Sequence, residues 1–168
     1  RIHGVFTAPV VPYHVDIELP SVEDTARALN LDVSDIGFDA HGIASLEGGP
    51  RFFYVPVNSR SALEKSKVIE PYWSKLIKPL GGVDAAYIYT RGGDDQKTNF
   101  RARMYSPTGG IIEDPATGSA TALLAAQLLK AEHLGDGTHR WQLEQGYEMG
   151  RPSDLRLEAD VAHSKLTA

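Results

Sequence analysis

The segment Glu113–Glu132, which reads EDPATGSATALLAAQLLKAE, decides how this chain of 168 residues folds. From Ala120 to Ala131 it is apolar on nearly every face of a helix, and only Thr121, Gln127 and Lys130 interrupt it. A helix with that pattern is usually enclosed on all sides. The sequence therefore predicts one buried central helix over about residues 117–132.

The first half of the same segment is small and polar, and two interpretations fit it. In the first, Asp114 caps the helix and Pro115 is its first residue, where the missing N–H costs nothing. In the second, the helix begins at Thr117 or Gly118, and its free N–H groups face a ligand. Both interpretations place the start of the helix within eight residues of Glu113.

Only the second interpretation explains the glycine. Gly near the start of a buried helix costs about 0.5–1 kcal/mol relative to Ala, but it lets a ligand approach the backbone. The N–H groups of Gly118, Ser119 and Ala120 can then hold a carboxylate or a phosphate, helped by the helix dipole. Asp114 is then free to carry a proton or to hydrogen-bond the ligand.

The composition is that of a soluble globular domain, with 42% hydrophobic and 23% charged residues. The net charge of −5 gives no reason to expect nucleic acid or an anionic membrane as partner. The chain has no cysteine, which excludes disulfides, thiolate metal sites and cysteine catalysis within it. Six scattered histidines show no metal-ligand spacing, and no apolar run is long enough to span a membrane. We expect a cytoplasmic protein without a metal or cofactor.

Short elements surround the predicted helix. Capping signals at Ser21 and Ser61 predict helices, the first ending near Asn30, and residues 70–78 are compatible with another helical turn or two. Extended segments are predicted over residues 2–9, 37–46, 51–57, 83–90, 99–105, 140–145 and 153–161. This order, with little strict alternation of strands and helices, favours the α+β class. The simplest way to bury the helix is to curl a mixed or antiparallel sheet around it.

The strand over residues 99–105 alternates apolar and basic side chains. Its pattern places Phe100, Ala102 and Met104 on one face, opposite Arg101 and Arg103. The two arginines fit structural ion pairs better than substrate ligands. The following loop, residues 106–113, is interpreted as an ordinary glycine-bearing connection.

Other catalytic motifs are absent from the sequence. There is no GxxxxGK[ST] phosphate loop and no GxSxG nucleophile motif. No pairing of His with Asp marks Ser119 as a nucleophile. A free-standing hydrolase that uses Ser119 is therefore the weakest of the functional hypotheses.

Two stretches together resemble a known family: RARMYSPTGGIIEDPATGSATALLAAQLL at residues 101–129, and LEQGYEMGRPSDLRLE at residues 143–158. They are similar to the second half of the phenazine-biosynthesis, PhzF-like proteins. The most specific part is EDPATGSA, followed at the right distance by GRPS. The resemblance covers residues 48–161 and extends to the start through FTAP, residues 6–9.

The resemblance implies a diaminopimelate-epimerase-like fold of two similar halves, each a curled sheet around a helix, with the active site between them. It implies a cofactor-independent isomerase that moves a proton within a small carboxylate substrate and usually forms a homodimer. Asp114 matches an acid/base or ligand-orienting position, and Gly118 and Ser119 match positions that bind the substrate carboxylate. We add Thr117 and Ala120 to the expected substrate-binding set.

The resemblance also sets expectations about the length of the chain. Residues 1–15 are expected to be the segment that crosses between halves, and residues 16–168 the C-terminal domain. The family's principal base, a glutamate in the first half, has no counterpart here, so we expect this chain alone to be inactive. A non-catalytic module that binds small anions or acts as a scaffold is the alternative.

Overall fold

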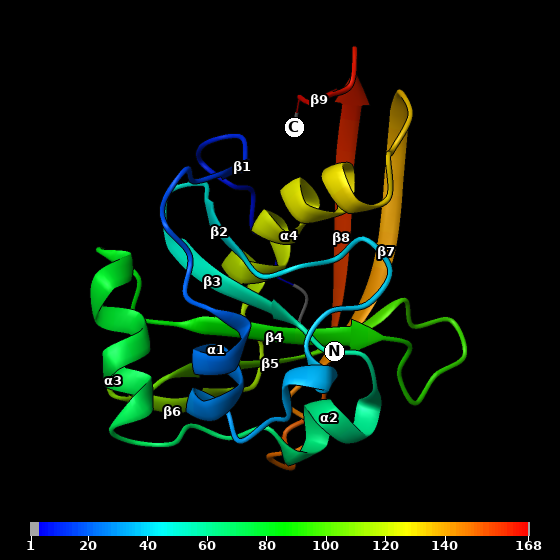
Figure 1. Cartoon of the computed structure of the whole chain (residues 1–168). Coiled ribbons are helices and arrows are strands. Elements are labelled where there is room, and N and C mark those ends of the chain that lie inside the picture. The colour runs from blue at the N-terminus through cyan, green and yellow to red at the C-terminus, as the bar shows by residue number, and fades with distance from the viewer. Residues whose placement is uncertain (1–3, 168) are drawn as a thin grey trace.

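The computed structural model describes residues 4–167, which form one mixed sheet curled around helix α4 (Gly118–Ala131). Figure 1 shows α4 lying between the pair β2 and β3 on one side and the pair β7 and β8 on the other. The strands are β1 (Tyr13–His14), β2 (Ala44–Glu47), β3 (Arg51–Pro56), β4 (Ala86–Arg91), β5 (Phe100–Ser106), β6 (Ile111–Asp114), β7 (Gly137–Gln145), β8 (Ser153–Ala162) and β9 (Lys165–Leu166).

The strand order is β1-β2-β3-β4-β5-β7-β8-β9, and β6 pairs with β5. Neighbouring strands are antiparallel except for the parallel pairs β3·β4 and β5·β7. The remaining helices are α1 (Val22–Ala28), α2 (Arg60–Lys65), α3 (Tyr72–Ile77) and the 3₁₀ turns η1 (Val33–Asp35) and η2 (Lys78–Leu80). The predicted α+β class with a sheet curled around one helix is confirmed.

The main core lies on the concave face of the sheet, around α4. Leu123 and Leu124 are fully buried against side chains from β2 to β5, β7 and β8. Two of the polar interruptions of the helix also have partners, because the Thr121 hydroxyl lies 3.1 Å from the Tyr87 hydroxyl and Gln127 donates to the Gly42 carbonyl. The helix runs over residues 118–131, within the predicted range of 117–132.

A second core covers the convex face of the central strands. Helices α1, α2 and α3 pack there against Phe53, Val55 and Ile88. Strand β5 alternates as predicted, because Phe100, Ala102 and Met104 belong to the concave core while Tyr105 belongs to the convex one. The sheet is thus buried on both faces at its centre.

Some predicted elements are wrong in detail. Residues 4–9 form no strand, and residues 1–3 lie outside the described residues; pairing begins only at Tyr13, after Pro12. The extended stretch 37–46 becomes a regular strand only from Ala44, with isolated bridges before it. Helix α2 is capped by Ser59, whose hydroxyl accepts from the Ala62 N–H at 3.2 Å, and not by Ser61.

Residues 106–113 were expected to form a loop, but strand β6 lies there and ends at Asp114. The position of β6 brings the residues of the candidate site together. One edge of β5 carries two strands end to end, β7 opposite Phe100–Ala102 and β6 opposite Met104–Ser106. In this register Gln145 lies opposite Ala102 and Asp114 opposite Met104. Because β7 is parallel to β5 and β6 is antiparallel, the carboxyl ends of both strands meet beside Arg103.

Candidate functional site

The start of α4 decides between the two interpretations of the motif. The helix begins at Gly118, with Thr117 at the N-cap, so the alternative with Pro115 as the first helical residue is wrong. Asp114 is instead the last residue of β6. Its carboxylate accepts from the Thr117 hydroxyl at 2.6 Å. The Thr117 N–H donates to Gln145 and not to Asp114.

Gln145, at the end of β7, holds the loop between β6 and α4. Its Nε2 donates to the Asp114 carbonyl at 2.8 Å and to the Thr117 hydroxyl at 2.9 Å. Its Oε1 accepts from the Thr117 N–H at 3.1 Å. The Gln145 side chain is completely buried, so these bonds form away from competing water.

The next N–H groups of the helix point out of its first turn. Within residues 4–167, nothing accepts a hydrogen bond from the N–H of Gly118, Ser119 or Ala120. Gly118 and Ser119 are partly exposed, whereas Ala120 is fully buried. A helix N-terminus with unpaired, accessible N–H groups is suited to hold a carboxylate or phosphate. Gly118 and Ser119 are therefore the accessible part of the predicted anion site.

The other two predicted substrate-binding residues, Thr117 and Ala120, are buried. Thr117 is buried, and both its N–H and its hydroxyl already have partners. The carbonyl of Ala120 accepts from the hydroxyl of Tyr54 at 2.6 Å, which fixes the first turn of α4 against β3. Burial raises the pKa of that tyrosine well above its usual value, so it stays a neutral donor.

Phe6 forms one wall beside the helix start. A Cβ built on Gly118 would lie 3.6 Å from the Phe6 Cβ, an ordinary contact distance. Phe6 is 47% exposed, so it presents apolar surface next to the accessible N–H groups. The candidate site thus combines a carboxylate, helix N–H groups without a partner among residues 4–167, and an apolar side chain.

The arginines of β5 lie on the opposite face and form ion pairs, as predicted. Arg103 makes two hydrogen bonds of 2.9 Å to the Glu113 carboxylate. Burial lowers the pKa of Arg103, but the bonds to Glu113 outweigh it and raise the pKa above its ordinary value. Arg101 pairs with Glu144 at 3.1 Å and with Glu148 at 2.8 Å.

Gln145 was not among the site residues predicted from the sequence, although the glycine that follows it, Gly146, was a signal of a close backbone contact. Gly146 has a φ of +79°, and a Cβ there would lie 2.8 Å from the Pro115 carbonyl oxygen and 2.3 Å from that of Arg151. Only glycine fits so close to two backbone segments. The Gln145–Gly146 pair therefore marks the place where the end of β7 touches the EDPATGSA loop.

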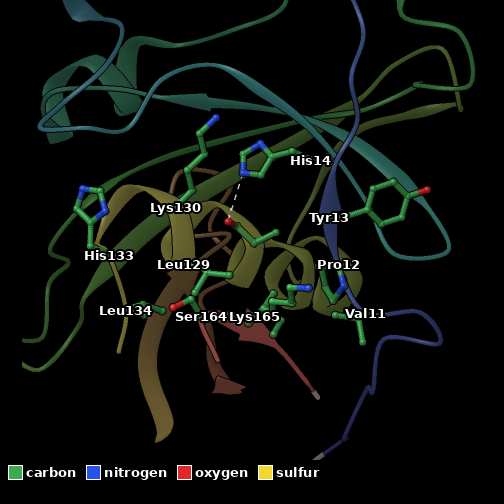
Figure 2. A pocket seen from close by; sticks show the side chains of 12 residues that line it. Val11, Pro12, Tyr13, His14, Leu129, Lys130, His133, Leu134, Ser164 and Lys165 are labelled. Carbon is green, nitrogen blue, oxygen red and sulfur yellow. Dashed lines mark hydrogen bonds between the residues drawn. The ribbon is translucent and has the colours of Figure 1, made fainter. Parts of the chain in front are cut away.

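A separate groove of about 730 Å³ lies along the other end of α4. Figure 2 shows His14 and Lys130 beside it, with the hydrogen bond between the His14 ring and the Ala126 carbonyl. Burial and the nearby Lys130 lower the pKa of His14. No residue of the EDPATGSA motif lines this groove, so it is distinct from the candidate site.

Residues 4–167 contain no group of three or more His, Asp or Glu side chains arranged to hold a metal ion. Across the same residues, every helix is too short or too polar to cross a membrane.

Comparison with known proteins gives several relatives with isomerase names. A protein named trans-2,3-dihydro-3-hydroxyanthranilate isomerase from Pseudomonas chlororaphis is 40% identical over 166 residues, which cover 94% of this chain and 54% of that protein. An uncharacterized isomerase from Mesorhizobium japonicum is 35% identical over 143 residues, covering 84% of this chain and 47% of the relative. The chain thus spans about half the length of these curated relatives.

Solved structures confirm the fold. The crystal structure of a PhzF-family phenazine biosynthesis protein from Bacillus anthracis superposes with a TM-score of 0.82 at 23% identity, covering 94% of this chain and 53% of that one. The family described as "Phenazine biosynthesis-like protein" matches residues 4–167. The chain belongs to this phenazine biosynthesis-like, PhzC-PhzF family.

Proposed function

We propose that this chain is the C-terminal half of a cofactor-independent isomerase that moves a proton within a small cyclic carboxylate. Residues 1–15 would cross from the other half, and residues 16–168 would belong to the C-terminal domain. The isomerase names of the relatives and their roughly twofold greater length support this proposal. The substrate class follows the relative that is named for a dihydro-hydroxyanthranilate.

The observation that carries the proposal is the pairing of Asp114 with an open helix start. The Asp114 carboxylate lies next to Thr117 at the N-cap, and the N–H groups of Gly118 and Ser119 follow directly. A substrate carboxylate bound to those N–H groups would place its neighbouring carbon atoms beside the Asp114 carboxylate. That arrangement suits proton transfer next to an anchored acid group.

We assign the two proton transfers of the reaction to two groups. An isomerisation removes a proton from one carbon and returns one to another, so the electron count of the substrate is unchanged. Asp114 would serve one of these positions, and the other group would come from the missing half. The helix start would stabilise negative charge that develops on the carboxylate-bearing part of the substrate. We also expect the complete protein to form a homodimer, as the resemblance implies.

The test uses trans-2,3-dihydro-3-hydroxyanthranilate in deuterium oxide. The chain is assayed alone and together with the first half of the Pseudomonas chlororaphis relative, and deuterium in the substrate and product is followed by mass spectrometry. We expect incorporation only with both halves present, and its loss in Asp114→Asn. Absence of incorporation with both halves, although the complex forms, contradicts the proposal.

A non-catalytic anion-binding module is the second candidate. It is favoured because the neighbouring carboxylates Glu113 and Glu148 are held in ion pairs with Arg103 and Arg101 and do not supply a second proton-handling group beside Asp114. Under this candidate, binding of small carboxylates at Gly118 and Ser119 persists while no deuterium enters the ligand. The same experiment therefore distinguishes the two functions.

A further inference from the structure

We propose that Thr117 is a positioning residue, and not a substrate ligand, which together with Gln145 fixes one oxygen of Asp114 and presents the other to the substrate. The inference rests on the proposed function of Asp114 in proton transfer. It changes the expected role of Thr117, which the sequence placed in the substrate-binding set. It also adds Gln145, which lies 31 residues from Asp114 in the chain.

The direction of the hydrogen bonds follows from the donors and acceptors present. The Gln145 amide nitrogen has two hydrogens, and it uses them on the Asp114 carbonyl at 2.8 Å and the Thr117 hydroxyl oxygen at 2.9 Å. The Thr117 hydroxyl thus accepts from Gln145. Its own hydrogen is donated to the Oδ2 of Asp114 at 2.6 Å.

The amide oxygen of Gln145 completes the arrangement. It accepts from the Thr117 N–H at 3.1 Å, so Gln145 binds both the backbone and the side chain of Thr117. Thr117 is 6% exposed and Gln145 is fully buried. Both residues lack room for a ligand contact, whereas their hydrogen bonds converge on Asp114.

The consequence concerns the two carboxylate oxygens of Asp114. Oδ2 is bound by Thr117, and Oδ1 has no hydrogen-bond partner among residues 4–167. A short hydrogen bond from a hydroxyl to a carboxylate is strong and directional. It restrains rotation of the carboxylate about χ2, a torsion with only a broad conformational preference in aspartate. Oδ1 is therefore the oxygen that exchanges the proton.

The matched variants are Thr117→Val, which keeps the shape and removes the hydroxyl, and Thr117→Ser, which keeps the hydroxyl. Both are made in the complex of the two halves, and kcat and KM for isomerisation are measured with trans-2,3-dihydro-3-hydroxyanthranilate. We expect Thr117→Val to lower kcat by about 10- to 100-fold with KM within about twofold, since misplacing a reacting group costs rate and not carboxylate binding. Thr117→Ser should restore kcat to within about threefold of the wild type.

Gln145→Met tests the hydrogen-bonded relay, which runs from the Gln145 amide through the Thr117 hydroxyl to Oδ2 of Asp114. It should lower kcat to a similar extent, and Thr117→Val added to it should have little further effect, because both changes remove the same restraint. A kcat of Thr117→Val within about twofold of the wild type, or a rise in KM that accounts for the whole loss, overturns the inference. Urea denaturation confirms that each variant is folded.

An NMR measurement separates failure of this inference from failure of the proposed function. The Thr117 hydroxyl proton should exchange slowly with water in the wild-type chain and rapidly in Gln145→Met. If the wild-type complex shows no isomerisation while this proton is protected, the proposed function fails and the hydrogen-bonded relay stands. If the proton exchanges rapidly in the wild type, the relay itself is wrong.

Discussion

The guanidinium of Arg103 and the carboxylate of Glu113 face each other through two hydrogen bonds of 2.9 Å each. Arg103 also donates to the carbonyls of Leu63, Glu64 and Ser66 at the end of α2. The first residue of the EDPATGSA motif is therefore turned away from the helix start. Glu113 ties the end of β6, where Asp114 lies, to β5 and to the convex layer.

Arg103→Met should destabilise the protein strongly. It leaves the largely buried Glu113 carboxylate, whose side chain is 11% exposed, without its partner. Breaking a buried pair in this way costs up to about 3–5 kcal/mol. Urea denaturation gives the free energy of unfolding, with Arg140→Ala as control, because Arg140 forms an exposed pair with Glu158. The control should cost at most about 1 kcal/mol. Equal losses in the free energy of unfolding of the two variants would contradict a larger contribution from the Arg103–Glu113 pair.

Gly118→Ala should stabilise the fold and weaken ligand binding. Among residues 4–167, the one contact of a Cβ at this position is with the Phe6 Cβ at 3.6 Å, an ordinary distance, so alanine fits there without strain. Replacing glycine in a helix by alanine is worth about 0.5–1 kcal/mol. The same methyl group stands where a carboxylate must approach the N–H groups. Calorimetric titration with 3-hydroxyanthranilate should show weaker binding, and unchanged affinity would place the anion elsewhere.

Two leucines of α4 test how completely the helix is enclosed. Leu123 is fully buried, whereas Leu129 lies beside the groove of Figure 2 and is partly exposed. Leu123→Ala should cost about 2–5 kcal/mol, the range for a buried leucine, and Leu129→Ala clearly less. The change in helix propensity is the same in both variants. Similar losses in urea denaturation would mean that both ends of the helix are equally covered.

Acid should destabilise the protein partly through Glu144. Burial raises the pKa of Glu144, but the N–H groups of Asp95 and Asp94 and the Thr98 hydroxyl outweigh this and lower the pKa below its ordinary value. The unfolded chain therefore takes up this proton first, and the contribution of Glu144 to stability is lost as the pH falls through its folded-state pKa. Unfolding in urea at a series of pH values measures this loss.

Glu144→Gln should be less stable than the wild type at neutral pH and should lose less stability between about pH 5 and pH 3. Glu158→Gln is the control, since the Glu158 side chain is 58% exposed. Parallel stability curves for Glu144→Gln and the wild type would contradict the role of Glu144.

The central helix and the arginine-bearing strand were predictable because their signals are local. An apolar run of Ala and Leu indicates a buried helix by itself, and the alternation over residues 99–105 assigns the faces of a strand. The two arginines were also correctly expected to form ion pairs. Strand β6 gave no such signal, because Ile111 and Ile112 are exposed and do not alternate with polar residues.

The contacts of the site were less predictable because they join distant segments. Gln145 bonds Thr117 across 28 residues and Asp114 across 31. The contact exists because β6 and β7 share one edge of β5, a register that no local pattern specifies. A glutamine at the end of a strand is usually exposed, so its burial at the site was not expected from the sequence.

The most direct test of the central claim is a titration of the amide protons at the start of α4. The chain, labelled with ¹⁵N, is titrated with 3-hydroxyanthranilate, a stable aromatic carboxylate. The N–H resonances of Gly118 and Ser119 should shift saturably, and that of Thr117, which is bonded to Gln145, should shift less. Absence of a saturable shift at Gly118 and Ser119, or saturable shifts confined to Lys130 and the groove of Figure 2, would contradict an anion site at the EDPATGSA motif.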